Sequence, residues 1–130
     1  MNEVRDYLKE AGMFFIATID GDQPRVRPFG VAEIYDNHLY IQTGKKKDVF
    51  KQIEKNGNVE ICAFNKGTWI RISGKLILDD RVEVKKYLLD MNPELRSMYN
   101  ENDDNTAALY FESGKAVIYS FTDAPKEIIF

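Results

Sequence analysis

Turn-forming residues divide most of this 130-residue sequence into short segments that favour β-strands. The segments are rich in β-branched and aromatic residues, and several are joined by only a few residues, such as Asp36-Asn37. Connections this short favour antiparallel pairing of consecutive strands, because a parallel connection needs about a dozen residues. Strands are expected over 13–19, 25–34, 39–43, 59–64, 68–78, 107–111 and 115–121, the last two forming a hairpin around Ser113-Gly114.

Apolar residues also recur at helical spacing, in segments that begin or end with helix-capping residues. Asn2 is expected to cap a first helix that Gly12 ends, and Asp80 with Glu83 forms a candidate capping box for a later one. Two further helices are expected over 48–56 and 92–99. A small antiparallel β-barrel with flanking helices fits this order and leaves few strand edges open, so the sequence predicts a mainly β (α+β) fold.

No linker, repeat or low-complexity stretch interrupts the chain, so residues 1–130 are expected to form a single domain. Aromatic side chains are expected to fill the core, namely Phe14, Phe15, Phe64, Tyr110, Phe111, Tyr119 and Phe121. Cys62, in an apolar strand, is likewise expected to be a small core residue.

Side chains that carry chemistry are scarce. The sequence has one histidine, His38, and one cysteine, so it forms neither an internal disulfide nor a Cys/His metal cluster. A Ser-His-Asp triad would need His38, which lies at a turn and is expected to be solvated. The acidic stretch 101–104 is expected to be a solvated loop, so the sequence assigns no catalytic residue and no metal site. Redox or group-transfer chemistry would therefore need a borrowed cofactor.

Charge and hydropathy argue against several partners. Lys and Arg number 18 and Asp and Glu number 21, and the resulting net charge of −3 gives no electrostatic reason to bind nucleic acid. No apolar run approaches the ~18 residues of a membrane span, and the first residues are charged and helical in pattern rather than a leader. Together with the single thiol, these features predict a cytoplasmic protein.

Three lysines, Lys45 to Lys47, stand directly before the helix expected at Asp48. The dipole of a helix disfavours cations at its N-terminus, although an exposed lysine there costs little. The run is therefore either a solvated charge cluster or the rim of an anion site. In the second interpretation the helix N–H groups, the lysines and the Thr43 hydroxyl hold a phosphate.

A second cationic group lies in the strand that follows Pro24. Alternation places Arg25, Arg27 and Phe29 on one face of this strand, which suits a groove for a phosphate and a flat ring. The alternative is a solvent-facing strand side with an arginine stacked on Phe29. Pro28 has no N–H, so the strand is expected at a sheet edge or interrupted there, which leaves neighbouring backbone groups free.

In the strand 68–78, Trp69, Arg71 and Ser73 alternate with core-facing isoleucines, and Gly74 indicates a bulge. A tryptophan beside an arginine on an outer face indicates a subunit interface or an aromatic ligand site, or simply an amphipathic strand. The three segments together describe a ligand with a phosphate at one end and a flat ring at the other.

These segments, taken in order, resemble the pyridoxamine 5′-phosphate oxidase-like flavoproteins. The resemblance rests on 24–30 (PRVRPFG), 39–50 (LYIQTGKKKDVF), 56–64 and 69–74. It runs from about residue 13 to 78 and continues more loosely to 121. It implies a split β-barrel that forms a homodimer and binds FMN in two grooves at the interface.

The resemblance also implies which residues hold the cofactor. Arg25 would meet the phosphate with Arg27 nearby, and Thr43 and the lysines would close around it, although which lysine does so stays open. The implied FMN-binding residues are Arg25, Val26, Arg27, Pro28, Phe29, Gln42, Thr43, Lys46, Lys47 and Trp69. Trp69 would reach the flavin of the partner subunit. A deazaflavin in place of FMN is a further alternative.

Departures from the family narrow the activity. Vitamin-oxidising members have a lysine where this chain has Gly30, and an Arg-x-His near the C-terminus where it has 120–125 (SFTDAP). Oxidation of pyridoxamine phosphate is therefore not expected. We expect a flavin-dependent reductase or oxidase of a small acceptor, such as a nitro compound or a quinone, with NAD(P)H as the candidate donor. The alternatives are a non-enzymatic FMN protein for electron transfer or flavin storage, and a flavin-free interaction domain.

Overall fold

The computed structural model describes residues 1–130 and folds them into an eight-stranded antiparallel sheet with three α-helices. The strands are β1 (Phe14–Asp20), β2 (Gln23–Phe29), β3 (Glu33–Tyr35), β4 (His38–Gly44), β5 (Asn58–Asn65), β6 (Thr68–Asp79), β7 (Thr106–Ser120) and β8 (Lys126–Ile129). The helices are α1 (Asn2–Ala11), α2 (Asp48–Lys55), α3 (Val82–Met91) and the 3₁₀ helix η1 (Pro93–Ser97). None of them is long and apolar enough to cross a membrane.

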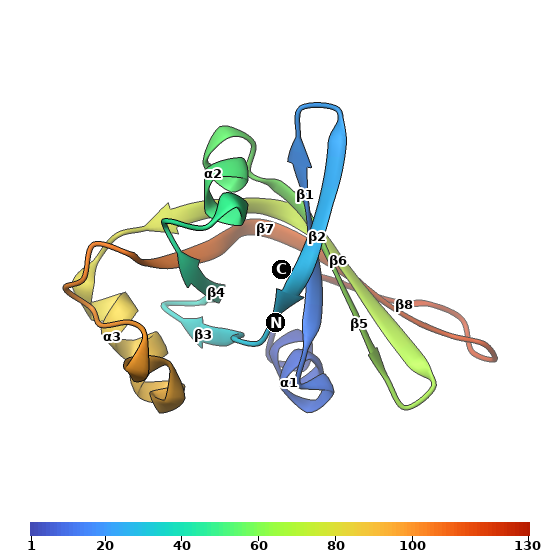
Figure 1. The fold of residues 1–130 in the computed structure, drawn as a ribbon. Helices are drawn as coiled ribbons and strands as arrows, with labels where there is room; N and C mark the ends of the chain where they lie inside the picture. Colours follow the sequence, from blue (N-terminus) through green and yellow to red (C-terminus); the bar gives the residue numbers. More distant parts are fainter.

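The sheet curls into a split barrel with helices at its sides (Figure 1). The strand order is β2-β1-β5-β6-β7-β4-β3, and β8 adds to β7. The end strands β2 and β3 do not pair with each other, which leaves the barrel open between them. Helix α1 contacts β5 and β3, α2 contacts β1, and α3 contacts β7 and β3. The predicted mainly β fold with flanking helices is confirmed.

The core lies inside the curled sheet and takes one face from α1 and one from α2, whereas α3 packs in a separate, smaller cluster with Tyr40 and Ala108. Val4 and Leu8 of α1 are buried, and α2 contributes Val49, Phe50 and Ile53. Ile70 and Ile72 of β6 are fully buried, as the alternation of that strand predicts. Burial of each such side chain stabilises the fold by about 1.5–3 kcal/mol relative to exposure.

The hairpin expected around Ser113-Gly114 is wrong, because β7 runs without a turn from Thr106 to Ser120. Gly114 pairs with Gly74 of β6, and the register of the two strands shifts between Gly74 and Leu76. The bulge expected at Gly74 is therefore present, and it bends both strands where a turn was predicted. The sequence pair Ser-Gly suits a bend as well as a turn.

Other boundaries differ more locally. The strand expected over 25–34 is two strands, because β2 ends at Phe29 and β3 begins at Glu33. Strand β8 was not predicted. The two N-caps are also wrong, because α3 begins after Arg81 and α1 after Met1, and neither residue makes a side-chain capping hydrogen bond. Gly12 ends α1, as predicted.

The outer face of β2, β1, β5 and β6 carries residues that the sequence placed in the core. Phe14 and Phe111 are buried, but Phe15, Phe64 and Phe121 are exposed, and Tyr110 and Tyr119 are half-buried. Cys62 is exposed as well, with Phe15 on one side and Arg71 on the other in the strand register. Strand alternation shows which residues of a strand share a face, but it does not show which of the two faces is buried.

Candidate functional site

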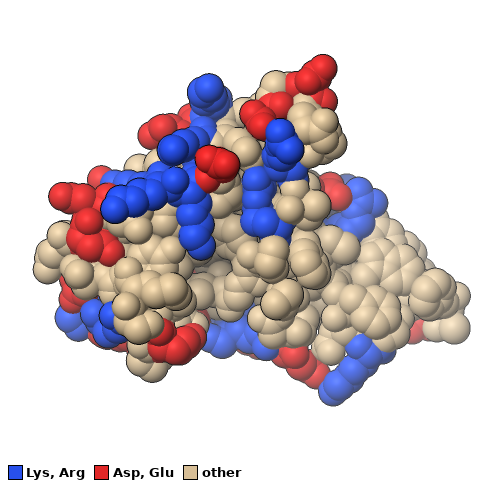
Figure 2. Space-filling model, in the orientation of Figure 1, with Lys and Arg blue, Asp and Glu red and all other residues tan.

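A pocket of about 440 Å³ lies where β2 passes the N-terminus of α2. Its lining consists of Asp20, Arg25, Arg27, Lys47, Asp48, Val49 and Gln52. The hairpin between β1 and β2 supplies the two arginines, which share a strand face, as alternation predicts. Lysine and arginine side chains gather over α2 and between α2 and β2 (Figure 2). Two segments that are far apart in the sequence thus place three cations around one pocket.

Arg27 is held by two neutral side chains. Its Nη1 donates to Oγ1 of Thr18 at 2.6 Å, and its Nη2 donates to Oε1 of Gln52 at 2.6 Å. The Thr18 hydroxyl also donates to Oε1 of Gln52, so the three side chains form a closed triangle between β1, β2 and α2. We call this set the Arg27 triangle. It fixes the guanidinium while leaving Nε and one N–H on each terminal nitrogen free of these bonds.

The pocket has an excess of unneutralised positive charge. Arg25 is paired with Asp20 at 3.0 Å, but Arg27 and Lys47 form no ion pair. Burial and the nearby charge of Arg25 lower the pKa of the Arg27 guanidinium, and Asp48 offsets this only in part. An anion between these groups would relieve the repulsion that lowers this pKa.

The start of α2 adds hydrogen-bond donors to the same pocket. The helix has no side-chain cap, and the N–H groups of Asp48 and Val49 have no acceptor in the protein. Free N–H groups at a helix N-terminus bind anions, aided by the helix dipole. The pocket therefore has the donors that a phosphate monoester requires.

The structure separates the three lysines that the sequence left equivalent. Lys45 turns away to Oδ1 of Asp80 at 2.9 Å, and Asn105 accepts the backbone N–H groups of Lys45 and Lys46. The side chain of Lys46 is exposed and does not line the pocket. Only Lys47 does so, which distinguishes it as the candidate phosphate ligand among the three.

The other sequence-predicted site residues lie outside this pocket. Thr43 is buried on the face of β4 that points to the core, and Gln42 is buried on the opposite face, its amide donating to the Thr43 carbonyl. Phe29 packs against the core beside Phe14, with 6.2 Å between ring centroids. Val26 and Pro28 are exposed on the outer face of β2.

Trp69 lies on the outer face of the sheet, and it does not contribute to the pocket of its own chain. Its ring stacks on Tyr119, with 5.5 Å between centroids and an interplanar angle of 14°, and it lies 5.1 Å from Phe121. This group and the Arg25 end of β2 are at opposite ends of the strands. A role for Trp69 in flavin binding would therefore require a second chain.

Sequence reasoning missed Thr18 and Gln52. Thr18 is the one polar residue in an apolar strand segment and is buried. Gln52 follows Asp48 by four residues, and this spacing places both side chains on one helix face. This spacing could have indicated that Gln52 lies near the start of the helix. Its role becomes clear only from the hydrogen bond with Arg27, which depends on the tertiary fold.

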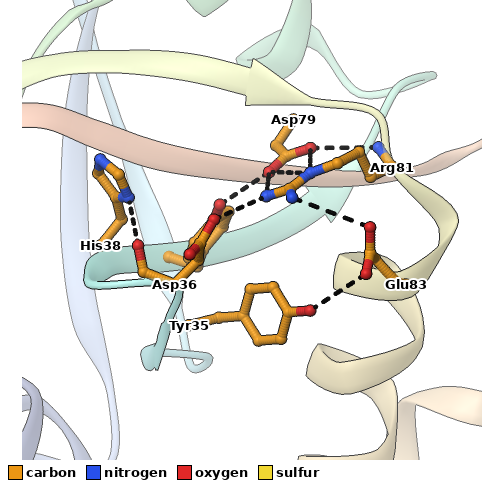
Figure 3. A network of polar contacts seen from close by, with 7 residues as sticks. Tyr35, Asp36, His38, Asp79, Arg81 and Glu83 are labelled. Atoms are coloured by element: carbon orange, nitrogen blue, oxygen red, sulfur yellow. Dashed lines mark hydrogen bonds and ion pairs between the residues drawn. The ribbon is translucent and has the colours of Figure 1, made fainter.

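A second polar cluster joins β4, β6 and the start of α3 (Figure 3). The buried Tyr40 hydroxyl donates to Asp79 at 2.7 Å, and the Arg81 guanidinium donates to both oxygens of the same carboxylate. Arg81 lowers the pKa of Asp79, while burial and the Asp79 carboxylate raise that of Tyr40. These groups satisfy one another, so the cluster is an anchor for α3 rather than a reactive centre.

His38 belongs to the edge of this cluster and is half-buried rather than solvated. Its ring lies 4.7 Å from that of Tyr110, and its Nδ1 contacts the Asp36 carbonyl at 2.8 Å.

Comparison with known proteins defines the class. The profile of the pyridoxamine 5′-phosphate oxidase family matches residues 1–115. A NimC/NimA family protein from Clostridium acetobutylicum is 43% identical, with a TM-score of 0.97 over 100% of this chain and 92% of the other. The split barrel is therefore that of the pyridoxamine 5′-phosphate oxidase family. The chain belongs to this family, a family of flavoproteins, as the sequence resemblance predicts.

More distant structures share the fold. General stress protein 26 from Bacillus anthracis is 17% identical, with a TM-score of 0.72 over 98% of both chains. A pyridoxamine 5′-phosphate oxidase-related, FMN-binding protein from Nostoc punctiforme is also 17% identical, with a TM-score of 0.64 over 97% of this chain and 90% of the other. No match is found among curated proteins.

Proposed function

We propose that this protein is a cytoplasmic, homodimeric FMN-binding oxidoreductase that reduces a small acceptor. The observation that carries the proposal is the convergence of Arg25, Arg27 and Lys47 with the uncapped start of α2. This donor set suits the phosphate of FMN, the ligand named for the Nostoc punctiforme relative. The single cysteine of the chain, a free thiol, fits a reducing compartment.

The residues around the pocket define what the chain contributes when FMN is bound. Lys47, Arg27 and the N–H groups of Asp48 and Val49 would hold the phosphate, with Arg25 at the rim. The family resemblance assigns Gln42, Thr43 and Lys46 to the phosphate as well, and it assigns the backbone groups of 26–29 to the flavin ring. FMN supplies the two-electron redox chemistry.

The outer sheet face supports the proposed homodimer. Val26 is 67% and Phe64 is 64% exposed, and both share this face with Phe15, Trp69 and Cys62. Exposed apolar patches of this kind mark interaction surfaces. A second copy of the chain packed on the face would cover these side chains and bring Trp69 to the partner's pocket. A two-fold symmetric dimer uses the same patch on both chains, so this one face is sufficient to form it.

The proposed reaction oxidises one NAD(P)H and reduces one acceptor. With a quinone, hydride from NAD(P)H and one proton from solvent yield NAD(P)⁺ and the hydroquinone. With a nitro compound, the same two electrons and two protons yield the nitroso compound and water.

Reconstitution with FMN tests the proposal. The protein is expected to retain FMN through gel filtration with a shifted visible spectrum, and Arg25→Glu and Lys47→Glu are expected to weaken retention. Retention in the wild type with consumption of NADH or NADPH in the presence of menadione or a nitroaromatic supports the reductase. Retention without turnover with any acceptor would instead favour flavin storage or electron transfer. If the wild type does not retain FMN and neither substitution makes a difference, both the reductase and the non-enzymatic FMN functions are rejected.

A further inference from the structure

Arg27 is the one arginine of this chain without an ion pair. The chain has six arginines, and Arg5, Arg25, Arg71, Arg81 and Arg96 each lie within salt-bridge distance of a carboxylate. Arg27 is half-buried, where an unpaired charge costs more than at an exposed position, yet both of its acceptors are uncharged. The fold therefore fixes this guanidinium in place without neutralising it.

Gln52 is the reason that Arg27 is held without an ion pair. Its Oε1 accepts from both Arg27 and Thr18, at 2.6 and 2.5 Å, in the geometry that a glutamate would offer equally well. A glutamate there would form an ion pair with Arg27 and compete with any anion in the pocket. The amide provides the same hydrogen bond and leaves the positive charge available.

Thr18 completes the arrangement by its hydroxyl, which accepts from Arg27 and donates to Gln52. The Thr18 side chain is buried, so water does not compete for the hydrogen bonds of its hydroxyl. With two of five N–H groups committed to the triangle, the guanidinium plane is fixed before a ligand arrives, and the ordering cost of binding is reduced.

We propose that Gln52 and Thr18 are positioning residues that make the pocket select a phosphorylated flavin over its unphosphorylated form. They act through Arg27, by fixing it with neutral acceptors, and do not themselves touch the phosphate. The inference rests on the proposed FMN-binding function and adds to it the residues that set phosphate selectivity.

The test measures the dissociation constants of riboflavin and of FMN. Their ratio, riboflavin over FMN, isolates the contribution of the phosphate. In Gln52→Glu, FMN affinity is expected to fall about 10- to 100-fold, the range for loss of one charge-assisted hydrogen bond, while riboflavin affinity stays within about twofold. Thr18→Val is expected to lower the ratio by a smaller factor, because Gln52 still holds Arg27.

Asn56→Asp is the matched control. It is also an amide-to-acid change near α2, one helical turn beyond Gln52, and Asn56 Oδ1 accepts only from the Asn58 N–H. Asn56→Asp is expected to leave the ratio unchanged. An unchanged ratio in Gln52→Glu, or an equal loss in Asn56→Asp, would overturn the proposal.

A second measurement separates this proposal from the proposed function. Inorganic phosphate is expected to raise the melting temperature of the wild type and of Asn56→Asp but not of Gln52→Glu. If the wild type binds neither flavin, the FMN function fails, and the phosphate effect still decides the role of Gln52. Equal stabilisation of wild type and Gln52→Glu by phosphate, or none of either, would then overturn it.

Discussion

Gly74 of β6 lies directly opposite Gly114 of β7, at the point where the register of the two longest strands shifts. A Cβ atom on Gly74 would lie 2.5 Å from the Ser113 carbonyl oxygen and 2.8 Å from the Phe111 ring. The two strands can therefore bend here because Gly74 has no side chain.

Gly74→Ala is expected to lower the free energy of unfolding by about 1–3 kcal/mol, because the backbone must shift to relieve the overlap. Urea unfolding measures the change. Gly30→Ala is the control, since a Cβ there meets only the Gly12 carbonyl, at 3.8 Å, and the expected change is within about 0.5 kcal/mol. Equal stability of the two variants would contradict this account of the bend.

The loop before β7 depends on one carboxylate. Burial alone would raise the pKa of Asp103, but hydrogen bonds from the N–H groups of Thr106, Asn100 and Asn105 lower it to about 2. Because the folded-state pKa lies below the ordinary value of 3.8, the stabilisation is complete above pH 4 and is lost as the pH falls towards 2.

Asp103→Asn is therefore expected to destabilise the protein by about 1–2 kcal/mol at pH 7, because an amide cannot accept all of these bonds. The difference from wild type should shrink as the pH falls from 4 to 2. Asp104→Asn is the matched control, because Asp104 is exposed and asparagine tolerates its positive φ of 56°. A constant difference across this pH range would rule out the Asp103 carboxylate as the cause.

The outer sheet face makes a prediction about assembly. Phe64→Asp is expected to convert a dimer to a monomer in sedimentation experiments, because it places a charge on the proposed interface. Met98→Asp, at a side chain of similar exposure (68% against 64%) that follows η1, is expected to leave the dimer intact.

The thiol of Cys62 provides an independent measurement of the same interface. Its reaction with a thiol reagent is expected to be slow in the wild type and fast in Phe64→Asp. A monomeric wild type with a freely reacting Cys62 would contradict the dimer.

Much of the fold was predictable from local pattern. The alternation of 68–78 placed Ile70 and Ile72 inside correctly, and Asp36 and Asn37 adopt the positive φ that a tight turn needs. Ser113-Gly114 was misread because a turn and a bend require the same permissive residues. Only the pairing of Gly114 with Gly74, a long-range contact, distinguishes them.

The site was predictable in part, because local sequence pattern shows its charges but not their long-range partners. The excess of cations at Arg25, Arg27 and Lys47 is visible in the sequence, but the pairing of Lys45 with Asp80 depends on the tertiary fold. Cys62 was predicted to lie in the core because its immediate neighbours Ile61 and Ala63 are apolar, but it shares its strand face with Glu60 rather than with those buried residues. An apolar outer face is typical of a surface covered by another chain, which a single sequence does not contain.

The most direct test of the central claim is a calorimetric titration of FMN into wild type, Arg27→Gln and Arg5→Gln. The account predicts one FMN per chain in the wild type and about 10- to 100-fold weaker binding in Arg27→Gln, because the variant loses a charge-assisted contact to the phosphate. Arg5, which is ion-paired with Asp6 on α1, should be replaceable with less than about a twofold change. Absence of FMN binding in the wild type, or equal affinities in the two variants, would contradict it.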